Sequence, residues 1–564
     1  MRKLLVLIVF LLSLTSHAQR SYVPHSVLAT GNWVRIGVKQ EGVYKVDVAM
    51  LNALGVNTAS LASTSIRLYG NGGGMLDESV NAQNDDDLKE NAIAMFDGGD
   101  GVFNNNDYFL FYAPGTVRWE KDSLQQLFHH HKNLYGDTAY YYLTVGGTGK
   151  RIQTAATAAA PTVQVNSYNE HYFYENDLVN LLSSGKEWYG EEFGSNPGVP
   201  LSRSFPVDFS GVLTGTPVTL ISRFAGRTVN GSSSFQLTVN GQPAQSATIA
   251  PVSGYFLDHY ATAVIRQNTF TANSGSLTIG CSFQPFNSNA QGWLDWFELH
   301  GRKSLVVGGN TPLFFRDWLS VGSQSVAAFT IINNGSGALT VWDITNARNP
   351  VQMNTSAVGS QVAFNNDASR LREYVAFGSA GWLTPIPLGK LANQDLHQSS
   401  AADYIIIAHP AFLQQAQRLA QFHQLREGLR TVVVQIDQLF HEFSGGMADP
   451  TAIRDFVKMF ANPRYLLLMG AGSFDYRNRI FNNINLVPCY ESANSLDPLL
   501  TYTSDDFFGL LTDSIALNVA VGRIPARTVE EATTMVDKII RYHAKESLGN
   551  WRTQTTYVAD DKDN

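Results

Sequence analysis

The hydrophobic pattern of the chain changes at about residue 402, and this change limits the folds that each part can adopt. Before it, apolar and polar residues alternate in short segments such as 107–115 and 139–147, which stop at Gly or Pro. This pattern is typical of strands with one face in a core and one face in water. After it, segment 403–410 (DYIIIAHP) is almost continuously apolar, which indicates a strand buried on both faces. We therefore expect β-rich N-terminal domains and an α/β C-terminal domain.

The C-terminal part alternates such strands with amphipathic helices. The predicted strands are 403–410, 431–436, 465–470, 517–522 and 555–559. One predicted helix follows the first strand, and another begins at Asp449-Pro450. A third begins at Thr528, which forms a capping box with Glu531. This alternation predicts a doubly wound parallel-sheet domain over residues 401–564. The domain is expected to be incomplete, because the chain ends just after the fifth strand.

Two changes in composition divide the β-rich part. Segment 154–162 (TAATAAAPT) consists of small residues without periodicity, and a second boundary is expected near 306–312. These seams predict an N-terminal β domain at 19–153, a sandwich-like domain at 163–306 and a small β domain at 312–400. Within the first of them, segment 32–48 alternates around Glu41-Gly42, which predicts a β-hairpin.

The first residues have the composition of a targeting signal. Arg2 and Lys3 precede an apolar run from Leu4 to Leu14, and Ser16-His17-Ala18 offers small residues to a signal peptidase. The run is too short to cross a bilayer, so residues 1–18 are predicted to be a cleaved signal peptide. We expect the mature protein outside the cytoplasm, in the periplasm, at the outer-membrane surface or in the medium.

Charge and cysteine content exclude some functions. The net charge of −8 gives no basic surface, so nucleic acid is not an expected partner. The two cysteines, Cys281 and Cys489, fall in different predicted domains, and two buried free thiols are a better interpretation than a disulfide. Cys281 lies inside an alternating strand, and Cys489, in a predicted rim loop, has no histidine paired with it, so neither is expected to be a nucleophile.

The segment YLLLMGAGSFDYRNR (465–479) carries a strand directly into glycines and then into polar residues. Functional groups of open parallel sheets gather beyond the carboxyl ends of the strands. Four residues there are candidates for a substrate-facing rim: Ser473, Asp475, Asp505 and Asp506. The carboxylates have an alternative interpretation, in which they cap turns and hold loop backbone. The segment lacks the P-loop lysine and the G-x-G-x-x-G spacing, which argues against a nucleotide site.

Other polar clusters invite a metal interpretation. Asp97, Asp100, Asn104 and Asp107 concentrate oxygen ligands that calcium prefers, but such runs also form hairpin turns, and their spacing is not that of an EF-hand. No cofactor is required on this reading, and calcium is a possible ligand. The histidines 129–131 are adjacent and cannot easily converge on one ion, so an exposed polar loop is predicted. His441-Glu442 lacks the second histidine of a zincin.

Seven segments of the C-terminal part resemble, in order, the gingipain family of cysteine peptidases (peptidase family C25), whose fold is related to that of caspases. They are 402–429, 443–458, 465–479, 486–492, 501–511, 519–532 and 557–564. Segments 31–47 and 96–115 narrow the resemblance to the type IX secretion sortases of Bacteroidetes. In this family a His in a Gly-His-Gly turn and a later strand-end Cys form the catalytic pair.

The resemblance places both catalytic residues after the segment YVADD (557–561), and this chain contains no Gly-His-Gly. The pair is therefore expected beyond Asn564, the last residue, and no catalytic His or Cys is assigned here. The chain is expected to be an inactive N-terminal part of a longer enzyme. Asp560 and Asp561 stand where some members place an acidic residue that assists the His. Ala471 stands where relatives often have Asp.

The resemblance implies a secreted cysteine endopeptidase or transpeptidase. Its substrates would be cargo proteins with C-terminal sorting domains, and its partner would be an outer-membrane barrel. The alternative is a non-enzymatic surface protein whose β domains bind carbohydrate or another protein and whose peptidase-like domain is degenerate.

Overall fold

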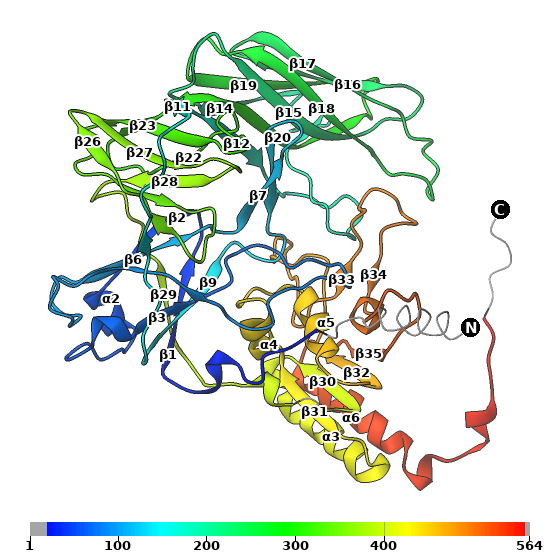
Figure 1. Cartoon of the computed structure of the whole chain (residues 1–564). Helices are drawn as coiled ribbons and strands as arrows, with labels where there is room; N and C mark the ends of the chain where they lie inside the picture. The colour runs from blue at the N-terminus through cyan, green and yellow to red at the C-terminus, as the bar shows by residue number, and fades with distance from the viewer. Residues whose placement is uncertain (1–19, 400, 559–564) are drawn as a thin grey trace, which may run out of the picture.

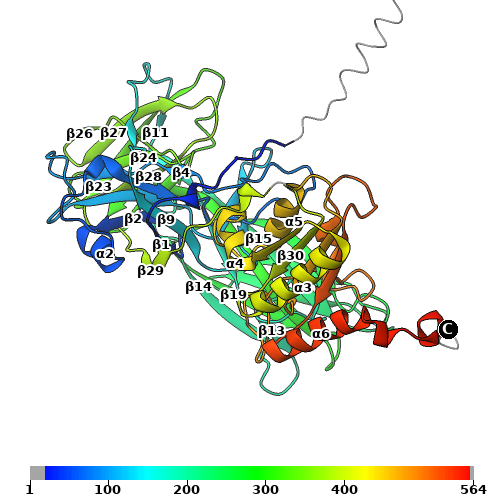
Figure 2. The ribbon, with the colours of Figure 1, turned by 90° about the horizontal axis from the view of Figure 1, so that it is seen from below.

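The computed structural model describes residues 20–399 and 401–558 (Figure 1). A β-rich part occupies the top and left of the view, and an α/β domain lies at the lower right. Seen from below in Figure 2, helices α3 (Leu413–Glu427) and α6 (Val529–Tyr542) lie side by side on the α/β domain. No helix in these described residues has the length and apolar content needed to cross a membrane.

The first β domain consists of two sheets that pack face to face. A five-stranded sheet has the order β29 (Ile386–Leu391), β1 (Trp33–Val38), β9 (Ala139–Val145), β3 (Ile66–Tyr69), β4 (Glu90–Asn91). A second sheet has the order β2 (Gly42–Asp47), β6 (Tyr108–Ala113), β5 (Ala94–Phe96). Apolar residues of both sheets, such as Ile36 and Phe109, share one core. Helix α2 (Val48–Ala53) follows β2 and is capped by Asp47.

The predicted hairpin around Glu41-Gly42 is wrong. Strand β1 pairs with β9 and β29, whereas β2 pairs with β6 in the other sheet. The alternation of residues 32–48 correctly indicated two strands that face one core. It carried no information about partners, because side-chain period fixes which face is buried and not which strand lies alongside.

The second domain is an antiparallel sandwich. One sheet has the order β12 (Ser167–Glu175), β20 (Gln291–Ser304), β15 (Pro217–Arg227), β18 (Thr262–Thr271), and β13 (Glu192–Gly194) also pairs with β20. The other has the order β14 (Ser202–Asp208), β19 (Ser276–Gln284), β16 (Ser233–Val239), β17 (Gln242–Ile249). Phe224 and Phe235 stack across the two sheets with ring centroids 4.5 Å apart. The buried side chain of Cys281 belongs to this core.

A third β unit also contains two sheets. One has the order β10 (Gln153–Thr154), β25 (Val351–Gln352), β24 (Thr340–Asp343), β28 (Glu373–Phe377), β22 (Leu313–Arg316). The other has the order β11 (Val163–Val165), β23 (Val326–Asn334), β27 (Gln361–Asp367), β26 (Ser356–Val358), with β21 (Val306–Gly308) also paired to β23. Phe329 and Phe364 stack in the core between them, 5.0 Å apart.

Sheet pairing crosses the boundaries expected from composition. The small-residue segment 154–162 joins β10 to β11, and both strands pair within the third β unit. Strand β29 returns from the predicted 312–400 domain to complete the first sheet beside β1. Composition marks where small residues gather, and it does not reveal which distant strand closes a sheet.

The α/β domain has a four-stranded parallel sheet with the order β31 (Thr431–Gln435), β30 (Tyr404–Ala408), β32 (Tyr465–Met469), β35 (Ala520–Ile524). Ile405 and Ile407 face helices α4 (Ile436–Phe443) and α5 (Thr451–Lys458) on one side. Ile406 and its neighbours face α3 and α6 on the other side. Burial of both faces explains the unbroken apolar runs, and the doubly wound fold class is confirmed.

The sequence misplaced some elements of this domain. The fourth strand begins at Ala520 rather than residue 517. No strand forms over 555–558, the described part of the predicted fifth strand, and the exposed Tyr557 and Val558 have no core to pack against. Helix α4 was missed, although Ile436, Leu439, Phe440 and Phe443 keep helical spacing and are all buried.

The histidines 129–131 do not lie in an exposed loop, and that prediction is wrong. They belong to strand β8 (Leu127–Lys132), which forms a hairpin with β7 (Val117–Asp122). His130 is buried against the sandwich, where Nδ1 lies 2.6 Å from Oε1 of Glu298 and Nε2 lies 2.7 Å from Oε2 of Glu175. His131, one residue further, points outward and contacts Glu120. The period of two in a strand explains this difference between neighbours.

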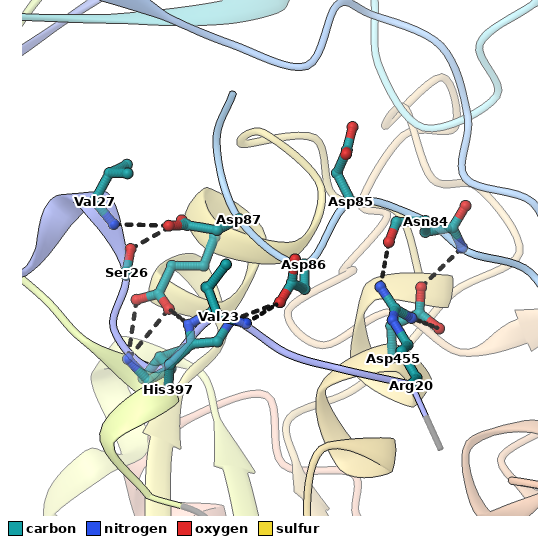
Figure 3. Close-up of polar contacts among 12 residues, drawn as sticks. Arg20, Val23, Ser26, Val27, Asn84, Asp85, Asp86, Asp87, His397 and Asp455 are labelled. Carbon is teal, nitrogen blue, oxygen red and sulfur yellow. Dashed lines mark hydrogen bonds and ion pairs between the residues drawn. The ribbon is translucent and has the colours of Figure 1, made fainter. Parts of the chain in front are cut away.

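Charged groups join the first β domain to the α/β domain (Figure 3). Asp87 lies in the loop before β4. It accepts hydrogen bonds from the Val27 N–H and the Ser26 hydroxyl, at 2.7 and 2.9 Å, which ties the N-terminal segment to this loop. Asn84 of the same loop donates to Asp455 of α5 at 2.8 Å. His397, in the turn that leads into the α/β domain, lies 2.8 Å from Glu442 and 3.7 Å from Asp86. These polar groups are shielded from water, so the loss of any one of them would leave its partners without a hydrogen bond.

Candidate functional site at the strand ends

The strand-end rim, which we define as loops 470–505, begins where β32 ends. Gly470 has φ +148°, and a Cβ there would lie 2.8 Å from Cγ2 of Val487. A Cβ on Gly472 would lie 3.1 Å from the backbone nitrogen and from Sγ of Cys489. The glycines therefore allow the loop after the strand to pack directly on segment 486–489.

Ser473 and Asp475 hold the loop after β32. The Asp475 side chain is fully buried, and Oδ2 accepts a 2.7 Å hydrogen bond from the Ile480 N–H. The Ser473 hydroxyl accepts from the Asp475 N–H at 3.1 Å and donates to Asn483. These contacts are those of a turn-capping carboxylate and hydroxyl. Contact of either residue with a substrate stays a prediction.

Asp505 lies against Arg523 of strand β35. Nε and Nη2 of the guanidinium donate to the two carboxylate oxygens, each at 2.7 Å, in a bidentate pair. Nη1 also donates to the carbonyl oxygens of Gly470 and Val487, at 2.8 and 2.7 Å. Arg523 thus fastens three parts of the rim together. Asp506 is exposed and begins a short helical turn, in which its N–H donates to the Ser504 hydroxyl.

Cys489 is buried within the same rim. Burial foremost, and then the negative charge of Glu491, raise the pKa of the thiol to about 12. Sγ donates to Oε1 of Glu491 at 3.4 Å, and neither cysteine of the described chain is hydrogen-bonded to a histidine. A thiol that keeps its proton at neutral pH is not an activated nucleophile. The prediction of two buried free thiols is confirmed.

The four calcium candidates lie in the loop between β5 and β6. Asp97 and Asp100 accept hydrogen bonds from backbone N–H groups two residues ahead, and Asp107 accepts from the Asn104 N–H at 2.7 Å. These are turn-forming contacts. Across residues 20–399 and 401–558, no group of three or more His, Cys, Asp or Glu side chains is arranged to hold a metal ion. Calcium binding here stays a prediction.

The expectations for the end of the chain fall on residues that the structure does not describe. Asp560 and Asp561, the candidates for assisting a catalytic histidine, lie outside the described residues, as does Asn564. Their role, and the expectation that the catalytic pair follows Asn564, therefore stay predictions. The described chain ends with Val558, four residues after the short helical turn η8 (Asn550–Thr553) and its C-cap Gln554.

His409 also shapes the strand ends, together with Arg523 and Glu491. His409, at the end of β30, accepts a hydrogen bond from the Ala411 N–H and caps the following turn. The sequence did not predict that Arg523 and Glu491 hold the rim together. The available signal was an arginine directly after the predicted strand 517–522, because a guanidinium close to a buried sheet requires acceptors.

Comparison with known proteins finds similarity to a peptidase family in the α/β domain and to a solved structure over almost the whole chain. The family model described as peptidase family C25 matches residues 397–564. The structure of dimeric latent PorU from Porphyromonas gingivalis is 26% identical, with a TM-score of 0.80 over 96% of this chain. The chain spans 52% of that PorU chain. No curated protein matches the sequence.

Smaller modules give weak similarities. A CBM36 domain of a xylanase from the hindgut metagenome of Trinervitermes trinervoides is 12% identical, and a CBM6 of the laminarinase LamC from Zobellia galactanivorans is 13% identical. They cover 23% and 24% of this chain and 98% of their own, each with a TM-score of 0.15, and carry no argument. The C25 match and the PorU similarity, which also includes the β-rich part, do carry an argument: residues 397–564 form a gingipain-type domain of peptidase family C25, and the chain has the fold of the matched part of PorU.

Proposed function

We propose that this chain is the N-terminal part of a secreted gingipain-type cysteine peptidase that serves as a type IX secretion sortase. One observation carries the proposal. The similarity to PorU runs through 96% of the chain, at a TM-score of 0.80, and so includes the β-rich domains as well as the peptidase-type domain. A likeness confined to the α/β domain would support peptidase ancestry alone.

In the proposed reaction, a cysteine thiolate attacks the carbonyl carbon of the scissile peptide bond. A histidine accepts the thiol proton and returns it to the leaving amine. Water or an acceptor amine then attacks the acyl-enzyme, which releases the product and restores the thiol. We propose that neither member of this pair lies in the present chain and that both follow Asn564. The buried, protonated state of Cys489 supports that assignment.

Location and partners follow from the same proposal. The signal sequence at 1–18 would direct export, and the peptidase would act at the outer membrane. Its substrates would be cargo proteins with a C-terminal sorting domain, and an outer-membrane barrel would hold it there. The acidic balance of the chain agrees with protein rather than nucleic acid as the substrate.

The test is to read and express the frame downstream of codon 564. We expect an open frame with a Gly-His-Gly turn and a later strand-end cysteine. The longer product should cleave a reporter carrying a C-terminal sorting domain, and iodoacetamide should abolish that cleavage, whereas residues 1–564 alone should not cleave it. A stop codon in well-covered sequence, with no cleavage by any form, would favour the non-enzymatic surface protein.

A further inference from the structure

We infer that residues 177–188 of the sandwich domain, here called the clasp, position the strand-end rim of the α/β domain. The inference rests on the proposed function and on the prediction that this rim faces the protein substrate. It assigns the β domains a part in shaping the peptidase site, and Gly185 and Lys186 are the positioning residues.

The centre of the clasp fits closely against the rim. Gly185 has φ +77°, and its N–H donates to Oε2 of the fully buried Glu491 at 2.8 Å. A Cβ at Gly185 would lie only 2.2 Å from the carbonyl oxygen of Asn494. The next backbone N–H, of Lys186, donates to the Ser492 carbonyl at 2.9 Å. Backbone contacts at this range leave no space for a side chain or a water layer.

The Lys186 ammonium joins three domains. It pairs with the carboxylate of Glu78 in the first β domain and lies 4.3 Å from the ring centroid of Tyr490 in the rim. Its side chain is only 10% exposed, so little water competes for these contacts. Glu78 also accepts a hydrogen bond from Tyr135 at 3.2 Å. One cation therefore links the sandwich, the first β domain and the rim.

The two ends of the clasp hold the loop after β32. Trp188 stacks on Phe474, with ring centroids 5.9 Å apart, and the Arg479 guanidinium lies 4.4 Å from the Trp188 centroid. At the other end, Asp177 accepts from Arg479 at 3.0 Å and pairs with Lys132 at 2.9 Å. Contacts of the clasp thus reach two parts of the rim, the loop after β32 that contains Phe474 and the later segment that ends at Asn494.

A further contact extends this attachment. Leu496 of the rim is buried in an apolar cluster with residues of the sandwich, among them Tyr189 and Trp293. The Glu187 N–H donates to the Ser495 hydroxyl at 2.9 Å, and the Ser495 N–H donates back to the Glu187 carboxylate at 3.1 Å. The rim is therefore ordered by the sandwich as well as by its own sheet, and loosening the clasp should release the rim.

The test measures hydrogen exchange in the whole chain for Gly185→Ala and Gly215→Ala. Gly215 has φ +79° and nothing within 4 Å of an added Cβ, so both variants carry the same backbone strain and only the first opposes the rim. We expect exchange in peptides from 470–505 to rise on the order of tenfold in Gly185→Ala and to stay unchanged in Gly215→Ala. Exchange in β30 should not change in either.

A second pair keeps the test informative if Gly185→Ala does not fold. Lys186→Met should raise rim exchange, whereas Lys186→Arg should restore it, because arginine keeps the charge and stacks on the tyrosine. Lys39→Met removes a lysine from an exposed pair and should change nothing. Equal rim exchange in folded Lys186→Met and Lys39→Met would overturn the inference. This readout needs no peptidase activity, so failure of the clasp and failure of the proposed function are distinguishable.

Discussion

Nδ1 of His397 lies 2.8 Å from Oε2 of Glu442, and both side chains are completely buried between the first β domain and helix α4. Glu442 also accepts hydrogen bonds from the Gln394 side chain and the Leu396 N–H. Burial alone would lower the pKa of His397, but its hydrogen bond to Glu442 and the surrounding carboxylates raise it. The contact is therefore a fully buried pair, in which the neighbouring carboxylates favour the protonated imidazole.

Glu442→Gln should destabilise the protein strongly. The change removes the carboxylate that is hydrogen-bonded to the buried His397 ring, and removal of one partner of a buried pair typically costs about 3–5 kcal/mol. Denaturant unfolding, followed by a probe on the α/β domain, measures the loss.

The control for this change is an exposed pair of the same chemistry. His131 lies 2.9 Å from Glu120, with 50% and 69% of the two side chains exposed. Glu120→Gln should alter the unfolding free energy by less than about 0.5 kcal/mol. Similar losses in both variants would show that the buried pair has no special role.

The second prediction concerns pH and His130. Burial alone would lower its pKa, but hydrogen bonds to Glu175 and Glu298 raise it from 6.5 to about 8. The stabilisation is fully present below pH 6.5 and is lost as the pH rises through 8. It amounts to about 2 kcal/mol, at 1.36 kcal/mol for each pKa unit.

His129 and His300 also contact Glu298, while burial lowers the pKa of His171 and His441, whose effects on stability run the opposite way with pH. The measurement is therefore the difference in thermal stability between wild type and His130→Gln at each pH. This difference should be largest near pH 5.5 to 6.5 and should shrink above pH 8. A difference that is constant across this range would contradict the assignment.

The sequence predicted the α/β domain better than the β domains, for a physical reason. Strands such as β30 and β32 are buried on both faces, so their apolar runs have few alternative explanations. Strand pairing over long sequence separation, such as β29 with β1, has no local signal. The histidines 129–131 were misread because their partners, Glu175 and Glu298, come from a distant sheet. Asp475 was placed correctly at the strand end, but its burial depends on how the loop folds back.

The third prediction tests the link between Arg523 and the rim. Arg523→Met would leave the Asp505 carboxylate and the carbonyls of Gly470 and Val487 without donors, and each unsatisfied group costs about 1–3 kcal/mol. The rim should open more often. Cleavage by chymotrypsin at Leu499, Leu500 and Tyr502, which are already exposed, should accelerate by on the order of tenfold or more.

Arg430 provides the matched control for this variant. It donates to both carboxylate oxygens of Asp403, each at 2.9 Å, but its side chain is 58% exposed. Arg430→Met should leave the cleavage rate unchanged, because water replaces the lost donor. If both arginine variants are cleaved at the wild-type rate, Arg523 does not hold the rim.

The fourth prediction concerns the reactivity of the two thiols. Burial foremost raises the pKa of Cys489, to about 12, and it likewise raises the pKa of Cys281 in the sandwich core. Since the thiolate is the reactive form, the native protein at pH 7.5 should react with iodoacetamide far more slowly than a free cysteine, and denaturant should expose two reactive thiols. Mass spectrometry counts the labels. Rapid labelling of Cys489 in the folded protein would mean that this thiol is exposed and activated, and it would remove the support that its burial gives to a catalytic pair outside this chain.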